Sequence, residues 1–243
     1  MCSLWQKRLV IWKVAAKPMN RLCPIVLLFF MSLSTQVQSA SVDDRVTQFG
    51  AAAEARLAPH FKAAGIPYPP ARATLIGLKQ ERELQLYAAA ATGPYRLIRT
   101  YPILAASGNA GPKLREGDRQ VPEGLYRIES LNPNSRYHLS LRVNYPNDFD
   151  RAQAKLDGRT TLGGDIMIHG NAVSIGCLAM GDPAAEELFV LAARTGLSNI
   201  QVILSPCEFR RHANLGPAPG APAWLPSLYE KIKAELAGYA LKK

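Results

Sequence analysis

Apolar residues recur at three- and four-residue steps near both ends of the chain, as they do along one face of a helix. In residues 43–65 this spacing includes Phe49 and Leu57, and Gly65 closes the segment. The pattern predicts an amphipathic helix there. Residues 227–241 have similar spacing and are expected to form a terminal helix.

A third helix is expected in DPAAEELFVLAARTGL, residues 182–197. Asp182 is interpreted as its N-cap, Pro183 as its first helical residue and Gly196 as its stop. An acidic residue, then proline, and a closing glycine are typical of helix boundaries.

Shorter segments have the alternating or continuously apolar pattern of strands. In ELQLY and YRLIR, apolar and polar residues alternate, which predicts strands with one face in water. Gly, Pro, Asn and charged residues separate these segments. The predicted strands cover residues 73–79, 83–90, 95–103, 125–131, 137–143, 165–169 and 199–206.

Connections rich in Gly and Pro lie between these elements. Long loops are expected at residues 107–124 and 216–226, and turns at 131–136 and 144–150. In the first loop, Asp118 and its neighbours are interpreted as turn-forming scaffold. Strands and helices do not alternate regularly, which argues against a doubly wound parallel sheet. We therefore expect a mainly β fold with peripheral helices, in the α+β class.

The first forty residues differ from the rest. Five Lys and Arg residues and no acid precede or flank the apolar run LCPIVLLFFMSL, which small and polar residues follow. This order predicts a secretory signal over residues 1–40, with Met19 as an alternative start and a membrane anchor as the alternative interpretation. The expected organisation is then residues 41–70 as helix and linker, 71–206 as the main domain, and 207–243 as loop and terminal helix.

Composition and charge exclude some functions. The 243 residues are 48% hydrophobic and 20% charged, as in globular proteins, and the net charge is +10. Loss of residues 1–40 would leave +5, without a basic stripe interleaved with aromatic residues. Nucleic acid is therefore not an expected partner, whereas a mild positive charge suits an anionic cell-wall polymer. Contact with a membrane is expected only through the signal segment.

Cysteine chemistry centres on IHGNAVSIGCLAM, residues 168–180. After removal of the signal only Cys177 and Cys207 remain, and export would allow them to form a disulfide or leave them as a reactive and a buried thiol. His169 precedes Cys177 by eight residues, so a turn between them can bring an imidazole base beside a thiol. The backbone around Gly176 and Cys177 is a candidate oxyanion site, and the helix expected from residue 182 would favour a thiolate.

Purely structural roles for these residues remain open at this point. A histidine at a strand end and a cysteine among Ile, Leu and Met are also ordinary structural residues. Metal binding is not expected, because no further Cys or His lies at ligand spacing. A papain-like peptidase would place its cysteine before its histidine, the reverse of the order here.

Three ordered segments resemble a known family. HGNAVSIGCLAM resembles the motif of YkuD-type L,D-transpeptidases, in which His-Gly precedes Ser/Thr-x-Gly-Cys. GPKLREGDRQVPEGLYRI resembles the same family's Gly-Asp-x-x-Thr-Pro-x-Gly-x-Tyr element, and LNPNSRYHLSLRVNYPNDFDRA is similar to its YafK-like branch. The resemblance covers about residues 74–205 and implies the YkuD-like β-sandwich fold and a cysteine enzyme without a cofactor.

The resemblance also implies roles for individual residues. Cys177 corresponds to the nucleophile and His169 to the general base and acid, while Ser174 and the Gly170 backbone are candidates to orient His169. Ser174 is alternatively a cap of the turn. Substrate-binding candidates are His138, Arg136 and Arg119, together with the loop cations Lys113 and Arg115.

Departures from the wider family indicate the reaction. Ile175 stands where most members have a second histidine, Ala179 replaces an arginine, and Val121 replaces the threonine before proline. Loss of that arginine removes a cation that could bind a substrate carboxylate. The implied partners are peptidoglycan stem peptides in the periplasm. The YafK-like branch is implied to cut the amide that joins an outer-membrane lipoprotein's lysine to diaminopimelate. Transpeptidation and a non-catalytic wall-binding module are the alternatives.

Overall fold

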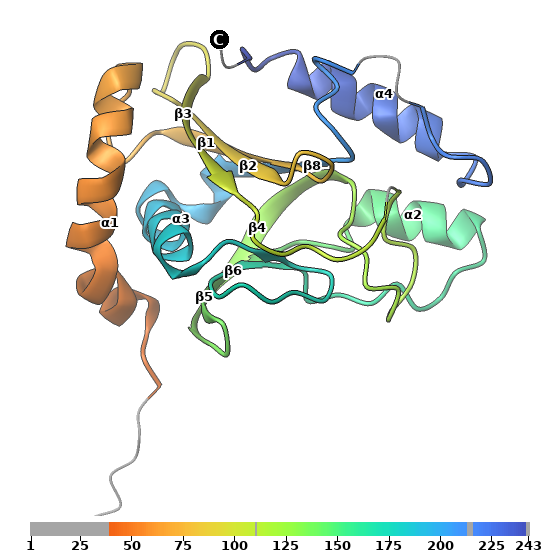
Figure 1. The fold of residues 1–243 in the computed structure, drawn as a ribbon, viewed down its shortest axis with the longest axis horizontal. Helices are drawn as coiled ribbons and strands as arrows, with labels where there is room; N and C mark the ends of the chain where they lie inside the picture. Colours follow the sequence, from red (N-terminus) through yellow and green to blue (C-terminus); the bar gives the residue numbers. More distant parts are fainter. Residues whose placement is uncertain (1–38, 110, 213–215, 242–243) are drawn as a thin grey trace, which may run out of the picture. The chain divides into compact units, whose positions relative to one another are not determined.

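Eight strands form one continuous, curled sheet in the order β3–β2–β1–β8–β4–β5–β6–β7 (Figure 1). The structure is a computed structural model that describes residues 39–109, 111–212 and 216–241. The expected signal segment therefore lies outside the described residues, apart from its last two. The strands are β1 Arg72–Leu78, β2 Glu83–Ala89, β3 Arg96–Pro102, β4 Gly124–Ser135, β5 His138–Val143, β6 Met167–His169, β7 Leu178–Ala179 and β8 Ile200–Ser205.

The long strand β4 joins the two halves of the sheet. Its first residues, from Gly124 to Arg127, pair with β8, whereas its later residues, from Ile128 on, pair with β5. The register between β4 and β5 shifts at Ile128, and such irregularities increase strand twist. The bend in β4 therefore carries β5, β6 and β7 away from the plane of the first strands.

Helices cover both faces of the central strands, which explains their continuously apolar sequences. On β1, Leu75 packs into the cluster that includes α1 and α3, whereas the next residue, Ile76, packs into the cluster that includes α4. Full burial of each such side chain contributes roughly 2 kcal/mol. The helices are α1 Val42–Ala64, α2 Asp148–Leu156, α3 Asp182–Thr195 and α4 Leu225–Leu236, with a short 3₁₀ turn at Leu197–Asn199. Within the described ranges, no helix has the length and apolar character needed to span a bilayer.

Most of the elements expected from the pattern are confirmed. The fold is mainly β with peripheral helices, and α1, α3, α4 and all the strands except the short β7 lie near the positions that the pattern predicts. The expectation that ELQLY has one face in water is wrong, because β2 is buried from Leu84 to Ala89. The expected turn at residues 131–136 is wrong, because β4 continues through Pro133 to Ser135 before the chain turns into β5. The expected turn at residues 144–150 misses helix α2, which Asn147 and Asp150 begin with a reciprocal capping box.

The start of α3 also differs from expectation. Gly181, not Asp182, is the N-cap, and Asp182 is the first helical residue. The Asp182 carboxylate instead accepts a hydrogen bond from the backbone N–H of Asn171, at 2.7 Å. The acid at this helix start therefore anchors the loop that follows His169.

Candidate active site

Strand β7 positions Cys177, which directly precedes it, between two other segments. On one side, Leu178 and Ala179 pair in parallel with Ile168 and His169 of β6. On the other side, Ala179 forms an isolated antiparallel bridge with Ala105. The cysteine segment is thus held along both edges next to the main hydrophobic core.

Strand geometry puts His169 and Cys177 on the same face. Ile168 and Leu178 are paired and both buried in the main core, so their neighbours in sequence point to the opposite face. His169 pairs with Ala179, and Cys177 stands two residues before that partner on the adjacent strand. The register therefore places the histidine and the cysteine of the motif on the same face of adjacent segments.

The turn before Cys177 is closed by Ser174. Its Oγ accepts a hydrogen bond from the Cys177 N–H at 2.9 Å and donates to the Cys177 carbonyl at 2.5 Å. Gly176 has a φ of 95°, a left-handed value that glycine adopts without a steric penalty. The bonds of Ser174 fit the turn-capping alternative rather than contact with His169.

His169 is 2% exposed and has a defined ring orientation. Its Nδ1 lies 2.6 Å from the Gly170 carbonyl oxygen. Because a carbonyl only accepts, Nδ1 carries the proton in this contact and Nε2 is the free acceptor of the neutral ring. The Tyr137 ring stacks on the imidazole, with 4.8 Å between centroids. Burial lowers the pKa of His169, which favours the neutral form.

The Cys177 thiol is partly exposed and contacts two backbone groups. The Met167 N–H donates to Sγ, and the thiol donates to the Asp165 carbonyl, both at 3.4 Å. Burial raises the pKa of Cys177, an effect that the Met167 N–H opposes. Helix α3 begins at Asp182, near its predicted start, and β7 lies between it and Cys177; stabilisation of a thiolate by the helix dipole stays a prediction. The resting pair is therefore a thiol and a neutral imidazole.

The candidate substrate-binding residues are spread over the surface. His138 lies at the start of β5, where its Nε2 is 3.1 Å from Glu186 and its ring packs edge-on against Phe49. Its side chain thus faces helices α1 and α3. Arg136 is exposed in the turn between β4 and β5, next to Tyr137, and Arg119 is exposed in the loop before β4.

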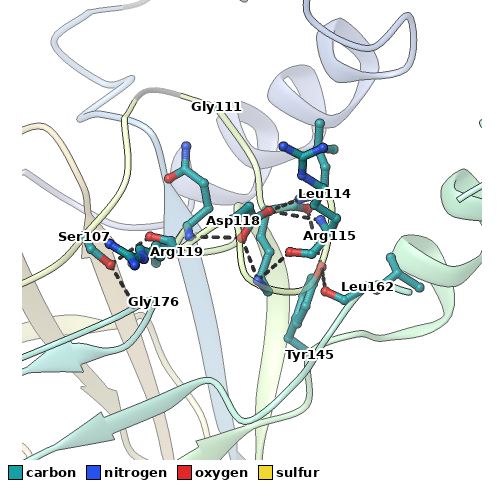
Figure 2. A network of polar contacts seen from close by, with 12 residues as sticks. Ser107, Gly111, Leu114, Arg115, Asp118, Arg119, Tyr145, Leu162 and Gly176 are labelled. Atoms are coloured by element: carbon teal, nitrogen blue, oxygen red, sulfur yellow. Dashed lines mark hydrogen bonds and ion pairs between the residues drawn. The ribbon is translucent and has the colours of Figure 1, made fainter. Parts of the chain in front are cut away.

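That loop, residues 104–123, is called the strap below. The Asp118 carboxylate organises it by accepting hydrogen bonds from the Lys113 ammonium and from the backbone N–H groups of Leu114, Arg115 and Gln120 (Figure 2). Lys113 is buried by this pairing, whereas the Arg115 side chain is exposed. These contacts agree with the interpretation of Asp118 as scaffold.

Two residues near the site were missed by sequence reasoning. Tyr137 stacks on His169, and the Ser107 hydroxyl accepts a hydrogen bond from the Gly176 N–H at 2.6 Å. Each lies in another segment of the chain, and no spacing rule links it to the motif. Tyr137 falls inside one of the flanking segments that carry the family resemblance, whereas Ser107 lies just before the other and had no such signal.

Other chemistry is limited among the described residues. Cys177 and Cys207 are both free, and Cys207 is buried in the cluster around α4, so the disulfide alternative is not the arrangement observed. No group of three His, Cys, Asp or Glu residues in the described part of the chain is arranged to bind a metal.

Known proteins match this chain over about half of its length. The model of the YkuD L,D-transpeptidase catalytic domain matches residues 76–202. YafK of Escherichia coli (strain K12), whose curated name assigns it provisionally as an L,D-transpeptidase, is 38% identical over 133 residues, or 53% of this chain and 51% of YafK. The same values hold for YafK of Escherichia coli O157:H7. The chain thus matches about half the length of these curated relatives.

Solved structures give weaker matches. The helical cell shape determining protein Pgp2 from Campylobacter jejuni is 25% identical with a TM-score of 0.46, over 56% of this chain and 48% of Pgp2. L,D-transpeptidase 1 of Mycobacterium tuberculosis is 16% identical with a TM-score of 0.33, over 55% of this chain and 62% of that protein.

Proposed function

We propose that this chain, which belongs to the YkuD family of L,D-transpeptidase catalytic domains, uses Cys177 as a nucleophile and His169 as its general base. The bond between His169 Nδ1 and the Gly170 carbonyl carries the proposal. With Nδ1 protonated, Nε2 is the basic nitrogen of the ring. The strand register places the His169 side chain on the same face as Cys177. Gly170 thereby acts as the orienting group that the third member supplies in a catalytic triad.

The proposed reaction begins from the neutral pair. His169 takes the thiol proton as Sγ attacks the carbonyl on the L-centre of meso-diaminopimelate. The tetrahedral intermediate collapses when the bond to the amine breaks, and His169 returns the proton to that amine. A thioester on Cys177 remains. Water then releases the acid and regenerates the thiol, whereas an amine acceptor would instead give transpeptidation. The step requires no cofactor.

Hydrolysis of a protein–peptidoglycan amide is the form of this reaction that the site supports best. Ala179 is fully buried and uncharged, so this strand offers no cation to a substrate carboxylate. The loop before Cys177 exposes apolar side chains instead, with Val173 55% and Ile175 74% exposed. Exposed apolar side chains beside a reacting group suit a polypeptide partner better than a short charged peptide end. We therefore propose an outer-membrane lipoprotein, joined through its lysine amine, as the leaving group.

The proposed setting is the periplasm, where peptidoglycan and such lipoproteins meet. The basic, apolar and small-residue order of residues 1–40 supports export. Stem peptides of peptidoglycan are the proposed acyl donors.

The test uses two wall substrates. Peptidoglycan with bound lipoprotein and lipoprotein-free tetrapeptide muropeptides are each incubated with wild-type protein, Cys177→Ala and Cys207→Ala. We expect lipoprotein release from the first substrate by wild type and Cys207→Ala only, with no new cross-links in the second. New diaminopimelate–diaminopimelate cross-links would establish transpeptidation instead. If neither substrate reacts in a Cys177-dependent way, the peptidoglycan enzyme is ruled out.

A further inference from the structure

A serine hydroxyl from the strap lies against the nucleophile segment. Ser107 Oγ accepts a hydrogen bond from the Gly176 N–H at 2.6 Å and donates one to the Arg119 carbonyl at 2.7 Å. Figure 2 shows this hydroxyl between the two backbone groups. Ser107 itself is half-buried.

An isolated bridge and one hydrogen bond hold Ser107 near Cys177. Ala105 and Ala179 form the antiparallel bridge and exchange backbone hydrogen bonds, and Ser107 Oγ is bonded to the N–H of Gly176, the residue before Cys177. Ala106 packs against the same core cluster as Leu178. Because neighbouring residues of an extended chain point to opposite faces, Ser107 and Cys177 turn away from that core.

The backbone donors expected for an oxyanion are already bound in the resting protein. The Cys177 N–H is bonded to Ser174 Oγ, which returns its own proton to the Cys177 carbonyl. The Gly176 N–H is bonded to Ser107 Oγ. The Ser107 hydroxyl differs from these groups, because it donates its own proton to a neutral carbonyl outside the cysteine segment, that of Arg119. A rotation about its C–O bond can redirect that proton.

We propose that the Ser107 hydroxyl is an oxyanion donor in the reaction of Cys177, which rests on the proposed role of Cys177 as nucleophile. As the Sγ–C bond forms, the carbonyl π electrons move to oxygen. Ser107 then turns its proton from Arg119 O to that oxygen. Its Oγ keeps the hydrogen bond from Gly176. When the intermediate collapses, the C–N bond breaks, the carbonyl re-forms and the Ser107 proton returns to Arg119 O.

Physical chemistry favours this exchange only while the oxyanion exists. A hydrogen bond to an anionic oxygen is roughly twice as strong as one to a neutral carbonyl. The Gly176 N–H polarises the hydroxyl and makes it a better donor, as in other hydrogen-bonded chains. The ground state keeps its bond to Arg119, so the interaction belongs to the transition state and should affect kcat.

The test compares two reagents that modify the same thiol. p-Nitrophenyl acetate acylates a thiol through a tetrahedral oxyanion: the Sγ–C bond forms, p-nitrophenolate leaves and an acetyl thioester remains. Iodoacetamide alkylates a thiol by displacing iodide, without an oxyanion. Rates are measured as the difference from Cys177→Ala for wild type, Ser107→Ala, Ser107→Thr and the control Ser227→Ala, whose serine is exposed on α4.

We expect Ser107→Ala to lower the acylation rate about 10²-fold, the usual loss when one oxyanion donor is removed. Its alkylation rate and Tm should match those of wild type. Ser107→Thr keeps the hydroxyl and should retain most of the acylation rate, and Ser227→Ala should retain all of it. In lipoprotein release, Ser107→Ala should lower kcat with little change in KM.

Three results would overturn the proposal. Acylation of Ser107→Ala at the wild-type rate removes the need for the hydroxyl. Equal decreases in the acylation and alkylation rates of Ser107→Ala would show that Ser107 only holds the strap against the cysteine loop. A wild-type Cys177 that is alkylated but never acylated lacks an oxyanion site altogether. Failure of the wall substrates alone, with Ser107-dependent acylation intact, would contradict the proposed substrate and not the oxyanion donor.

Discussion

The Tyr137 ring stacks on the His169 imidazole, with 4.8 Å between centroids and 30° between planes, although the two residues belong to different strand ends. Tyr137 therefore covers one face of a ring whose pKa burial lowers. Tyr137→Ala should expose the imidazole and move the pKa of His169 back up towards its ordinary value. An NMR titration of His169 checks this. Tyr137→Phe keeps the stacking and should leave the titration unchanged; a similar shift in both variants would contradict the role of the ring.

Gly170 is required by close approach and not by backbone conformation. A Cβ at this position would lie 2.5 Å from the Asp182 carboxylate and 2.8 Å from the Tyr137 carbonyl. Gly170→Ala should therefore displace the carbonyl that orients His169 and lower kcat for lipoprotein release by about tenfold or more. Gly216→Ala is the matched control, because nothing lies within 4 Å of its Cβ. Wild-type kcat in Gly170→Ala would show that the loop can absorb the methyl group.

The stability of the fold should depend on pH through Asp150. Burial raises the pKa of this carboxyl from 3.8 to about 6, despite hydrogen bonds from Asn147 and Tyr126. The folded state holds the Asp150 proton more tightly than the unfolded state does. The stabilisation from this protonation is therefore complete below about pH 4 and is lost as the pH rises through 6. The resulting decrease in the free energy of unfolding is at most about 3 kcal/mol.

Asp150→Asn tests this linkage by removing the titration. Urea unfolding between pH 4 and 7 should show a shallower fall in the free energy of unfolding than wild type shows. Asp148→Asn, at the exposed first residue of the same helix, should keep the wild-type profile. An identical profile in Asp150→Asn and wild type would assign the pH dependence to other groups.

The strap is attached to the fold through a buried ion pair. The Glu123 carboxylate, whose side chain is fully buried, accepts from Lys79 at 2.8 Å, from the Gly111 N–H and from the Tyr229 hydroxyl. Glu123→Leu leaves the Lys79 ammonium with only the carbonyl oxygens of Gly111 and Val121 and no opposite charge, and should lower the free energy of unfolding by about 3–5 kcal/mol. The double variant with Lys79→Met should lose less than the single Glu123→Leu variant, as chemical denaturation can measure. Additive losses would mean that the two side chains act independently.

Local pattern was sufficient for much of the fold. Helix α1 was predictable because Phe49 and Leu57 repeat at helical spacing, and burial of one stripe requires that spacing. Helix α2 was missed because Pro146 and Asn147, which precede it, also fit a turn. Only the reciprocal hydrogen bonds between Asn147 and Asp150 identify a capped helix. The bend of β4 depends on two different partner strands, which its own residues do not specify.

The sequence by itself identified the candidate nucleophile, base and turn residues, because they lie within one short segment of the chain. His169 is hydrogen-bonded to the Gly170 carbonyl, and Ser174 is hydrogen-bonded to the backbone of Cys177; both pairs are local in sequence. Only the tertiary structure decided which groups surround them. Tyr137 and Ser107 reach the segment through strand pairing, and Ser107 is 69 residues from Gly176. Strand pairing is set by burial across the whole sheet, so no local pattern encodes these contacts.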